Sequence, residues 1–213
     1  MSKKDGKDMN ERSVVVVSAG LSQPSSTRLL ADRLTAATVD ELAARGITAK
    51  VTNVELRDLA HDVVNAMLTG YSGGALAAAV DAVKGADGIV AVTPIYSASY
   101  AGLFKSFVDI LEADSLAGIP VLIGATGGTA RHSLAIDYAL RPLLAYLRAD
   151  VQATAVFAAT DDWATAGGDD DNPLPARIRR AGRELAETVA DREPSAPAGL
   201  FDAVPSFTDL LGS

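Results

Sequence analysis

The chain contains no cysteine and only two histidines, His61 and His132, among its 213 residues. The absence of cysteine excludes disulfides, iron–sulfur clusters, thiolate zinc sites and cysteine nucleophiles, and the shortage of histidine argues against a structural metal site. Positive charge is also scarce, because 19 Lys and Arg residues stand against 27 Asp and Glu, giving a formal net charge of −8. Nucleic-acid and anionic-membrane surfaces both require a basic face, so this balance argues against either partner.

Long apolar runs are absent as well. No stretch approaches the ~20 apolar residues of a membrane span, and the first residues, MSKKDGKDMNERS, lack the apolar centre of a signal peptide. We therefore expect a cytoplasmic protein. We predict that residues 1–12 are a disordered polar arm, that residues 13–193 are one domain, and that residues 194–213 are an apolar tail docking on its own domain or on a partner subunit.

Short apolar runs recur along the domain and alternate with helical patterns. The runs that we interpret as buried strands are residues 13–19, 89–92, 119–125 and 151–158, and residues 47–56 alternate well enough to form a further strand. Strands that alternate with helices predict an α/β three-layer sandwich of the flavodoxin-like type, with a five-stranded parallel sheet in the order 2-1-3-4-5.

Most connections between these strands carry helical patterns. The expected helices are residues 28–45, 75–84, 101–111, 130–147 and 173–192. Residues 57–74 have no clear pattern, and we predict a long irregular excursion that covers a site or an interface. Ligands of such sheets bind at the carboxyl ends of the strands, so the loops at that edge contain the candidate functional residues.

The loop after the first strand, residues 20–27, is rich in hydroxyls. Its hydroxyls and free backbone N–H groups at a helix N-terminus suit a phosphate without a lysine or arginine. The candidates are Ser22, Ser25, Ser26 and Thr27. The alternative is that these side chains only cap the helix.

Other phosphate-binding motifs are missing from this loop. A dinucleotide fingerprint needs repeated glycines and a P-loop needs Gly-Lys-Ser/Thr, whereas the loop has a single glycine, Gly20. A phosphorylated receiver domain needs an acidic pair after the first strand, where Ser18 and Ala19 stand. The sequence therefore argues against a dinucleotide-binding or P-loop protein and excludes a receiver domain.

The next loops add groups suited to a flat ring. Residues 93–100 carry Tyr96 and Tyr100 with small hydroxyls at Ser97 and Ser99, although the tyrosines could merely plug the end of the sheet. Gly127 and Gly128 let backbone N–H groups approach a ring closely and stabilise negative charge. His132 adds a donor, or else begins a helix with its side chain bonded to backbone. A phosphate site, a flat ring and an anion-stabilising loop together describe flavin mononucleotide, FMN.

The segments TPIYSASYAGLFKSFVDIL and GATGGTARHSLAIDYALRPLLAYLRAD resemble the NAD(P)H-dependent FMN reductase family, specifically the flavin-supplying components of two-component monooxygenases of the alkanesulfonate type. The resemblance covers residues 13–160. It implies hydride transfer from NADPH or NADH to FMN, with no catalytic side chain and no metal. It also implies delivery of reduced FMN to a flavin-dependent monooxygenase by a homodimer or homotetramer.

The resemblance assigns roles to residues as well. The implied flavin contacts are Ser22, Ser25, Ser26 and Thr27 for the phosphate, Pro94, Ile95, Tyr96, Ser97 and Ser99 for the ribityl chain and ring, and Thr126, Gly127, Gly128 and Thr129, with His132 beside them, for the pyrimidine edge. Tyr138 matches an aromatic insertion that forms a π-bulge at a subunit interface near the flavin. Where many relatives have an arginine in the phosphate loop, this chain has Gln23 and Pro24, and Arg28 is the nearest cation.

Two other functions remain open from the sequence. One is a flavodoxin-like electron carrier that binds FMN tightly without turnover, which the acidic charge fits. The other is a quinone or azo reductase, which shares the first half-reaction and differs in the acceptor.

Overall fold

The computed structural model describes residues 10–164 and 173–193. Four long strands form the centre of a parallel sheet in the order β2-β1-β3-β5. Their bounds are β1 (Glu11–Ser18), β2 (Thr48–Glu55), β3 (Gly88–Tyr96) and β5 (Pro120–Gly127). The flavodoxin-like α/β fold that the sequence predicts is confirmed.

The first strand starts earlier than predicted. It begins at Glu11 rather than at residue 13, because Arg12 is buried and donates hydrogen bonds to the carbonyls of Val189 and Arg192 at 3.3 and 3.1 Å. Glu11 and Arg12 therefore belong to the domain and not to the polar arm. The rest of that arm and the apolar tail, residues 194–213, lie outside the described residues, so the division of the chain into three parts stays a prediction.

The predicted count of five strands is wrong, since the described residues alone form a sheet of seven. The run that we interpreted as the last strand is split into β6 (Asp150–Val151) and β7 (Val156–Ala159), both paired with β5. Side chains take the backbone groups between them: Arg141 donates to the carbonyls of Gln152 and Ala153, and the Thr154 N–H donates to Glu184. These bonds replace the missing rungs of the ladder.

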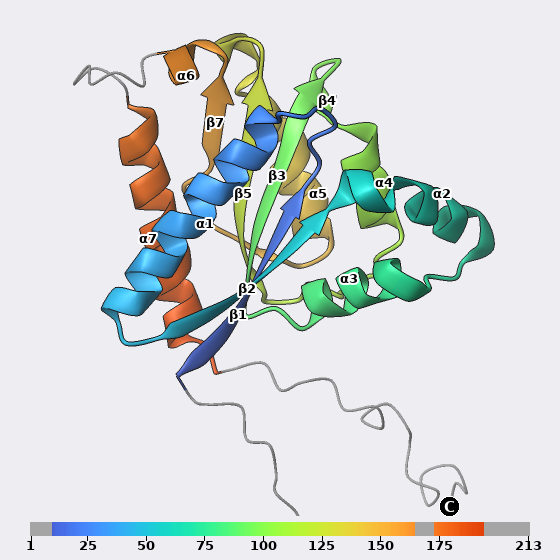
Figure 1. Cartoon of the computed structure of the whole chain (residues 1–213), viewed down its shortest axis with the longest axis horizontal. Helices are drawn as coiled ribbons and strands as arrows, with labels where there is room; N and C mark the ends of the chain where they lie inside the picture. Colours follow the sequence, from blue (N-terminus) through green and yellow to red (C-terminus); the bar gives the residue numbers. More distant parts are fainter. Residues whose placement is uncertain (1–9, 165–172, 194–213) are drawn as a thin grey trace, which may run out of the picture.

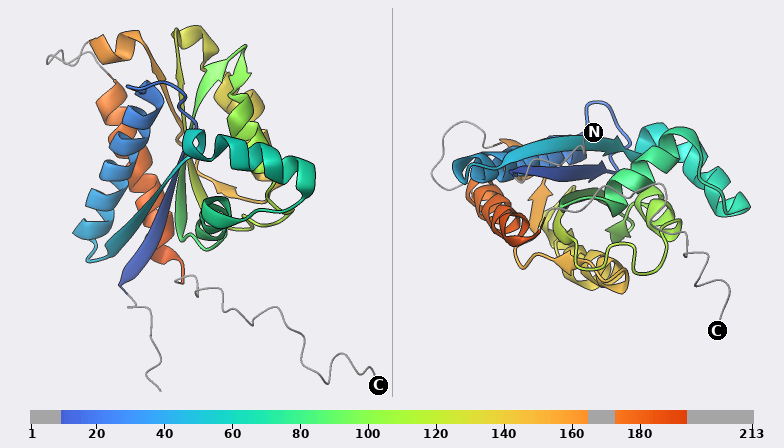
Figure 2. Two further views of the ribbon diagram at one scale, coloured as in Figure 1. Left: turned by 45° about the vertical axis from the view of Figure 1, so that its right-hand side comes forward. Right: turned by 90° about the horizontal axis from the view of Figure 1, so that it is seen from below.

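Helices cover both faces of the sheet, which makes three layers (Figure 1). One face packs against α1 (Ser26–Ala44) and α7 (Leu174–Asp191), and the other against α3 (Gly74–Lys84), α4 (Gly102–Asp109) and α5 (Arg141–Tyr146). Alternate side chains of β1 face opposite layers: Val14 and Val16 meet α1 and α7, while Val15 and Val17 meet the other helices. Figure 2 shows α1 and α7 side by side, and Gly182 permits this approach because a Cβ there would lie 2.7 Å from the Cβ of Ala37.

The predicted irregular excursion at residues 57–74 is wrong. A 3-10 helix η1 (Leu56–Leu59) leads directly into α2 (Ala60–Thr69), which ends at Gly70 with φ of 71°. Val63 and Ala66 are buried on one side of α2, whereas Val64 and Leu68 are exposed on the other. No single helix in the described parts of the chain is long and apolar enough to cross a membrane, although η1–α2 and α3, bent by 86°, pass that test as a pair.

The segment at residues 93–100 is a β-hairpin rather than a loop. Strand β3 continues to Tyr96, the chain turns at Ser97 and Ala98, and β4 (Ser99–Tyr100) pairs back antiparallel. Both turn residues have positive φ, 48° and 67°, as the favoured two-residue hairpin turns require. The turn residues Ser97 and Ala98 are not the Asn-Gly or Asp-Gly pair that normally marks such a turn, so local sequence does not predict the hairpin.

The helix expected at residues 130–147 is replaced by three successive segments of different helical type. It starts as a 3-10 turn, η2 (Ala130–His132), becomes a π-helix, η3 (Ile136–Leu140), and only then continues as α5. Tyr138 lies within the π-helix, so the π-bulge that the resemblance implies is present. The widened turn leaves Tyr138 80% exposed while Ile136 and Leu140 on either side of it are buried.

Candidate functional site

A polar pocket of about 290 Å³ lies at the carboxyl edge of the sheet, and we call it the edge pocket. Its lining consists of Leu21, Ser22, Ser26, Thr27, Pro94, Ile95, Tyr96, Thr126, Gly127, Gly128, Thr160 and Trp163. These residues come from the ends of β1, β3, β5 and β7, which are neighbours in the sheet. The topology therefore brings together all three loops that the sequence singled out.

The first loop divides its hydroxyls between two tasks. Ser25 is the N-cap of α1, with its Oγ accepting from the Arg28 N–H at 3.2 Å, so the capping alternative is correct for this residue. Ser22 and Ser26 are exposed on the rim of the edge pocket. Thr27 is buried, and its hydroxyl shares a 2.8 Å hydrogen bond with the hydroxyl of Thr126 at the end of β5.

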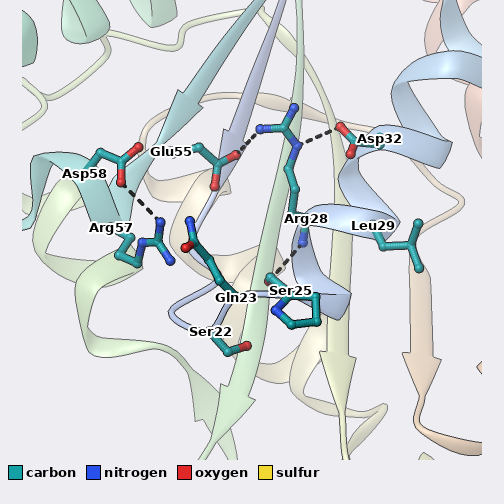
Figure 3. Close-up of a pocket in the computed structure, with 11 residues that line it drawn as sticks. Ser22, Gln23, Ser25, Arg28, Leu29, Asp32, Glu55, Arg57 and Asp58 are labelled. Atoms are coloured by element: carbon teal, nitrogen blue, oxygen red, sulfur yellow. Dashed lines mark hydrogen bonds and ion pairs between the residues drawn. The ribbon is translucent and has the colours of Figure 1, made fainter.

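Arg28, the cation nearest to the loop in sequence, is not among the residues that line the edge pocket. Its guanidinium donates to Asp32 at 2.7 Å and to Glu55 at 2.6 Å, inside a neighbouring pocket of about 360 Å³ (Figure 3). The hydrogen bond to Asp32 and that to Glu55 raise the pKa of Arg28 above its ordinary value, against the effect of burial. In this structure Arg28 therefore pairs with two carboxylates outside the edge pocket.

Gln23 and Arg57 border that same neighbouring pocket (Figure 3). In the amide orientation that satisfies both groups, the Gln23 oxygen accepts from Arg57 Nη1 at 3.1 Å. Arg57 also lies 3.5 Å from Asp58. The two arginines on this side are therefore balanced by local acceptors.

The hairpin places one tyrosine at the pocket and one away from it. Tyr96 lines the edge pocket and is 48% exposed, whereas Tyr100 is partly buried and packs on Phe104 with ring centroids 6.3 Å apart. Thr93 fixes the hairpin, since its hydroxyl donates to the Pro94 carbonyl and accepts from the Ala101 N–H, each at 3.1 Å. Tyr100 therefore packs at the end of the sheet, as the alternative interpretation proposes, whereas Tyr96 faces the edge pocket.

Two predicted hydroxyls of the hairpin are not in the pocket lining. Ser97 is exposed at the turn itself, and Ser99 sits in β4 opposite Tyr96. Pro94 and Ile95 do line the pocket. The hairpin therefore presents an apolar and aromatic surface at this edge rather than a row of hydroxyls.

The two glycines of the third loop have different surroundings. A Cβ on Gly127 would lie 2.8 Å from the Phe157 ring, so this residue must be small for the fold. A Cβ on Gly128 would meet nothing within 4 Å and the residue is exposed in the pocket wall, so the space beside it is open to a ligand. Thr129 and His132 are exposed just beyond the lining.

Tyr138 does not line the edge pocket of its own chain. Its side chain is 80% exposed. The contact with the flavin of another subunit that the resemblance implies therefore stays a prediction. Sequence reasoning missed Leu21, Thr160 and Trp163, although all three follow strands that end at this edge. Thr160 and Trp163 follow β7, so the preference of ligands for the carboxyl ends of parallel strands is a sequence signal that points to them.

The chemistry of the lining fits FMN. Hydroxyls of Ser22 and Ser26 at the start of α1 can bond a phosphate, and the apolar Pro94–Tyr96 surface can lie against a flat ring. The open space beside Gly128 lets a ring approach the backbone, as no Cβ occupies it. A flavodoxin-like sheet with such a pocket at its carboxyl edge defines a flavin-binding class of protein.

The comparisons identify the family. The family model described as NADPH-dependent FMN reductase matches residues 12–164. An FMN reductase (NADPH) of Pseudomonas aeruginosa is 34% identical over 185 residues, covering 84% of this chain and 93% of the relative. The NADH-dependent FMN reductase SfnF of Pseudomonas putida is 36% identical over 148 residues, covering 70% and 77%.

Solved structures agree with this family. An oxidoreductase from Corynebacterium diphtheriae superimposes with a TM-score of 0.82 at 46% identity, covering 86% of this chain and 99% of the other. The apo form of the NADH:FMN oxidoreductase EMOB superimposes with a TM-score of 0.73 at 32% identity, covering 88% of this chain and 96% of the other. This chain belongs to the NADPH-dependent FMN reductase family, and it is an NAD(P)H:FMN oxidoreductase.

Proposed function

We propose that this chain holds FMN in the edge pocket, reduces it with NADPH or NADH, and releases the reduced flavin to a flavin-dependent monooxygenase. When bound, FMN supplies the chemistry by accepting a hydride from the nicotinamide. The chain's own residues bind and orient the two rings, which is why no acid–base pair is needed among the lining residues.

The proposal assigns the pocket in three parts. Ser22, Ser26 and Thr27 hold the phosphate at the start of α1, and Pro94, Ile95 and Tyr96 hold the ring. Backbone N–H groups of Gly127, Gly128 and Thr129 stabilise negative charge on the reduced ring. Ser25 contributes by fixing the loop through its helix cap. Ser97, Ser99 and His132 lie outside the lining and are proposed to contact only parts of the flavin that extend beyond the pocket.

One observation supports release of the flavin: the edge pocket has an exposed rim, and none of the described residues that line it is charged. Leu21 and Tyr96 are 45% and 48% exposed, and Ser22, Ser26 and Gly128 are exposed too. A phosphate held only by neutral donors in partial contact with water is bound less tightly than one paired with a buried arginine. FMN then behaves as a substrate that exchanges, as a flavin-supplying reductase requires.

The test is an anaerobic incubation of the enzyme with excess NADPH or NADH and a molar excess of FMN, followed by ultrafiltration. We expect reduced FMN in the filtrate in many-fold excess over enzyme, and product formation when the filtrate is given to a monooxygenase that requires reduced FMN. If the flavin stays with the protein at one equivalent, the chain is a carrier or passes its electrons directly to an acceptor. Quinone or azo-dye reduction faster than FMN reduction would favour the alternative acceptor.

A further inference from the structure

In the described parts of the chain, the pocket proposed for the FMN phosphate has no charged side chain in its lining. The phosphate carries about −1.5 to −2 charges at neutral pH. Arg28 is engaged by Asp32 and Glu55 in the neighbouring pocket. Any positive charge that assists the neutral donors of Ser22 and Ser26 must therefore come from outside the lining.

Trp163 lines the edge pocket from the side opposite the hairpin. It is the only tryptophan of the chain and lies in α6 (Asp161–Ala164), directly after β7. Strand β5 pairs with β3 on one side and with β7 on the other, so Tyr96 and Trp163 flank the loop at Gly127 and Gly128. Figure 1 shows α6 at the same end of the sheet as the start of α1, where the phosphate hydroxyls are.

Arg33 brings positive charge to this side of the pocket. Its guanidinium lies over the Trp163 ring, 5.0 Å from the ring centroid. Arg33 follows Ser26 on α1 by two helical turns, so the two residues share a face, and helical side chains incline toward the N-terminus. Within residues 10–164 and 173–193, no carboxylate is ion-paired with Arg33, in contrast to Arg28 and Arg45.

The indole of Trp163 adds a hydrogen-bond donor beside the positive charge of Arg33. Its Nε1–H is a donor without acceptor capacity, which suits a phosphate oxygen. The ring holds Arg33 by a cation–π contact, which keeps a guanidinium near the pocket without placing it in the lining. We propose that Trp163 and Arg33 form the phosphate-side wall of the edge pocket and set the preference of this enzyme for FMN over riboflavin. This inference rests on the proposed FMN site.

The test compares FMN with riboflavin, which carries the same ring without the phosphate. Dissociation constants are measured by flavin fluorescence for the wild type and for Trp163→Phe, Arg33→Met and Arg28→Met. Phenylalanine keeps a ring in place but removes the N–H, and methionine keeps much of the stem but removes the charge. Riboflavin binding and circular dichroism serve as checks that each variant retains the pocket.

We expect Trp163→Phe to raise the FMN dissociation constant about tenfold and Arg33→Met about threefold, with riboflavin changed less than about twofold. Added salt should weaken FMN binding in the wild type and less so in Arg33→Met, because screening acts on the charge. Arg28→Met should leave the ratio of the two constants unchanged.

Three results would overturn the inference. The first is an equal weakening of FMN and riboflavin binding in Trp163→Phe and Arg33→Met. The second is an unchanged FMN dissociation constant in both of these variants. The third is a loss of the preference for FMN over riboflavin in Arg28→Met instead. All three presuppose a wild type that binds and reduces FMN. A wild type that binds neither flavin would contradict the proposed function itself, so the two failures are distinguishable.

Discussion

The hydroxyls of Thr27 and Thr126 meet at 2.8 Å in a buried hydrogen bond that joins the first turn of α1 to the end of β5. The bond links the proposed phosphate loop to the glycine loop, which are 99 positions apart in the sequence. It fixes two walls of the edge pocket relative to each other.

Replacing either threonine of this pair with valine should destabilise the protein. Thr126→Val leaves the Thr27 hydroxyl buried and unpaired, at a cost of about 1–3 kcal/mol in the free energy of unfolding. The double variant Thr27→Val/Thr126→Val should cost less than the sum of the two single variants, because neither partner is then left alone. Urea unfolding of the four proteins measures this coupling, and strict additivity would show that the bond is not made in solution.

The two adjacent glycines should respond in opposite ways to valine. Gly128→Val should fold normally, because a Cβ there meets nothing within 4 Å, yet it should abolish FMN reduction by filling the space where the ring approaches. Gly127→Val should lower the unfolding temperature, since its Cβ would lie 2.8 Å from the Phe157 ring. Thermal unfolding and NADPH oxidation assays separate the two effects. Normal FMN binding and turnover in Gly128→Val would contradict the assignment of this loop.

Ser25 allows helix capping to be separated from phosphate binding. Ser25→Ala removes the cap that accepts from the Arg28 N–H, which should cost about 1 kcal/mol of stability. Ser25→Asp keeps a good N-cap but places negative charge beside the proposed phosphate site. We therefore expect Ser25→Asp to match the wild type in stability and to bind FMN at least about tenfold more weakly. An unchanged FMN dissociation constant would place the phosphate elsewhere.

Glu184 should make the stability of the protein depend on pH. Partial burial acts to raise its pKa, but hydrogen bonds from Thr154 and Arg180 outweigh burial and lower the pKa below the ordinary value. A carboxyl whose pKa is lower in the folded protein stabilises it above the unfolded pKa of about 4.3, and that contribution is lost as pH falls through the folded pKa. The difference in unfolding free energy between the wild type and Glu184→Gln should therefore be largest near neutral pH and shrink in acid. A constant difference from pH 7 to pH 3 would refute this account.

Tyr138 tests whether the π-helix is part of a subunit contact. Because its side chain is 80% exposed, Tyr138→Ser should leave the folding of a single chain within about 0.5 kcal/mol of the wild type. If the predicted dimer or tetramer forms through this face, the same change should weaken association, as sedimentation velocity over a range of concentrations would reveal. Tyr146→Ser, at a 76% exposed position on α5, provides a matched control.

The local patterns of the sequence were sufficient for the main elements. Buried apolar runs predicted β1, β3 and β5, alternation predicted β2, and helical spacing predicted α1, α3 and α7, because all these patterns depend on residues close in the sequence. The edge rule for parallel sheets then singled out nine residues that line the edge pocket, whose contact with FMN stays a prediction: Ser22, Ser26, Thr27, Pro94, Ile95, Tyr96, Thr126, Gly127 and Gly128. The helix α2 was missed despite the buried spacing of Val63 and Ala66 and the stop at Gly70.

The sequence by itself determined the flavodoxin-like fold, the edge at which the ligand site lies and the neutral, hydroxyl-rich character of the proposed phosphate loop. Only the tertiary structure decided which side chains share the pocket. It turned Arg28 toward Asp32 and Glu55, placed Trp163 in the lining with Arg33 against it, and divided the last strand at Gln152. These outcomes depend on contacts between segments far apart in the chain, where burial and ion pairing decide the direction of a side chain and local periodicity carries no information.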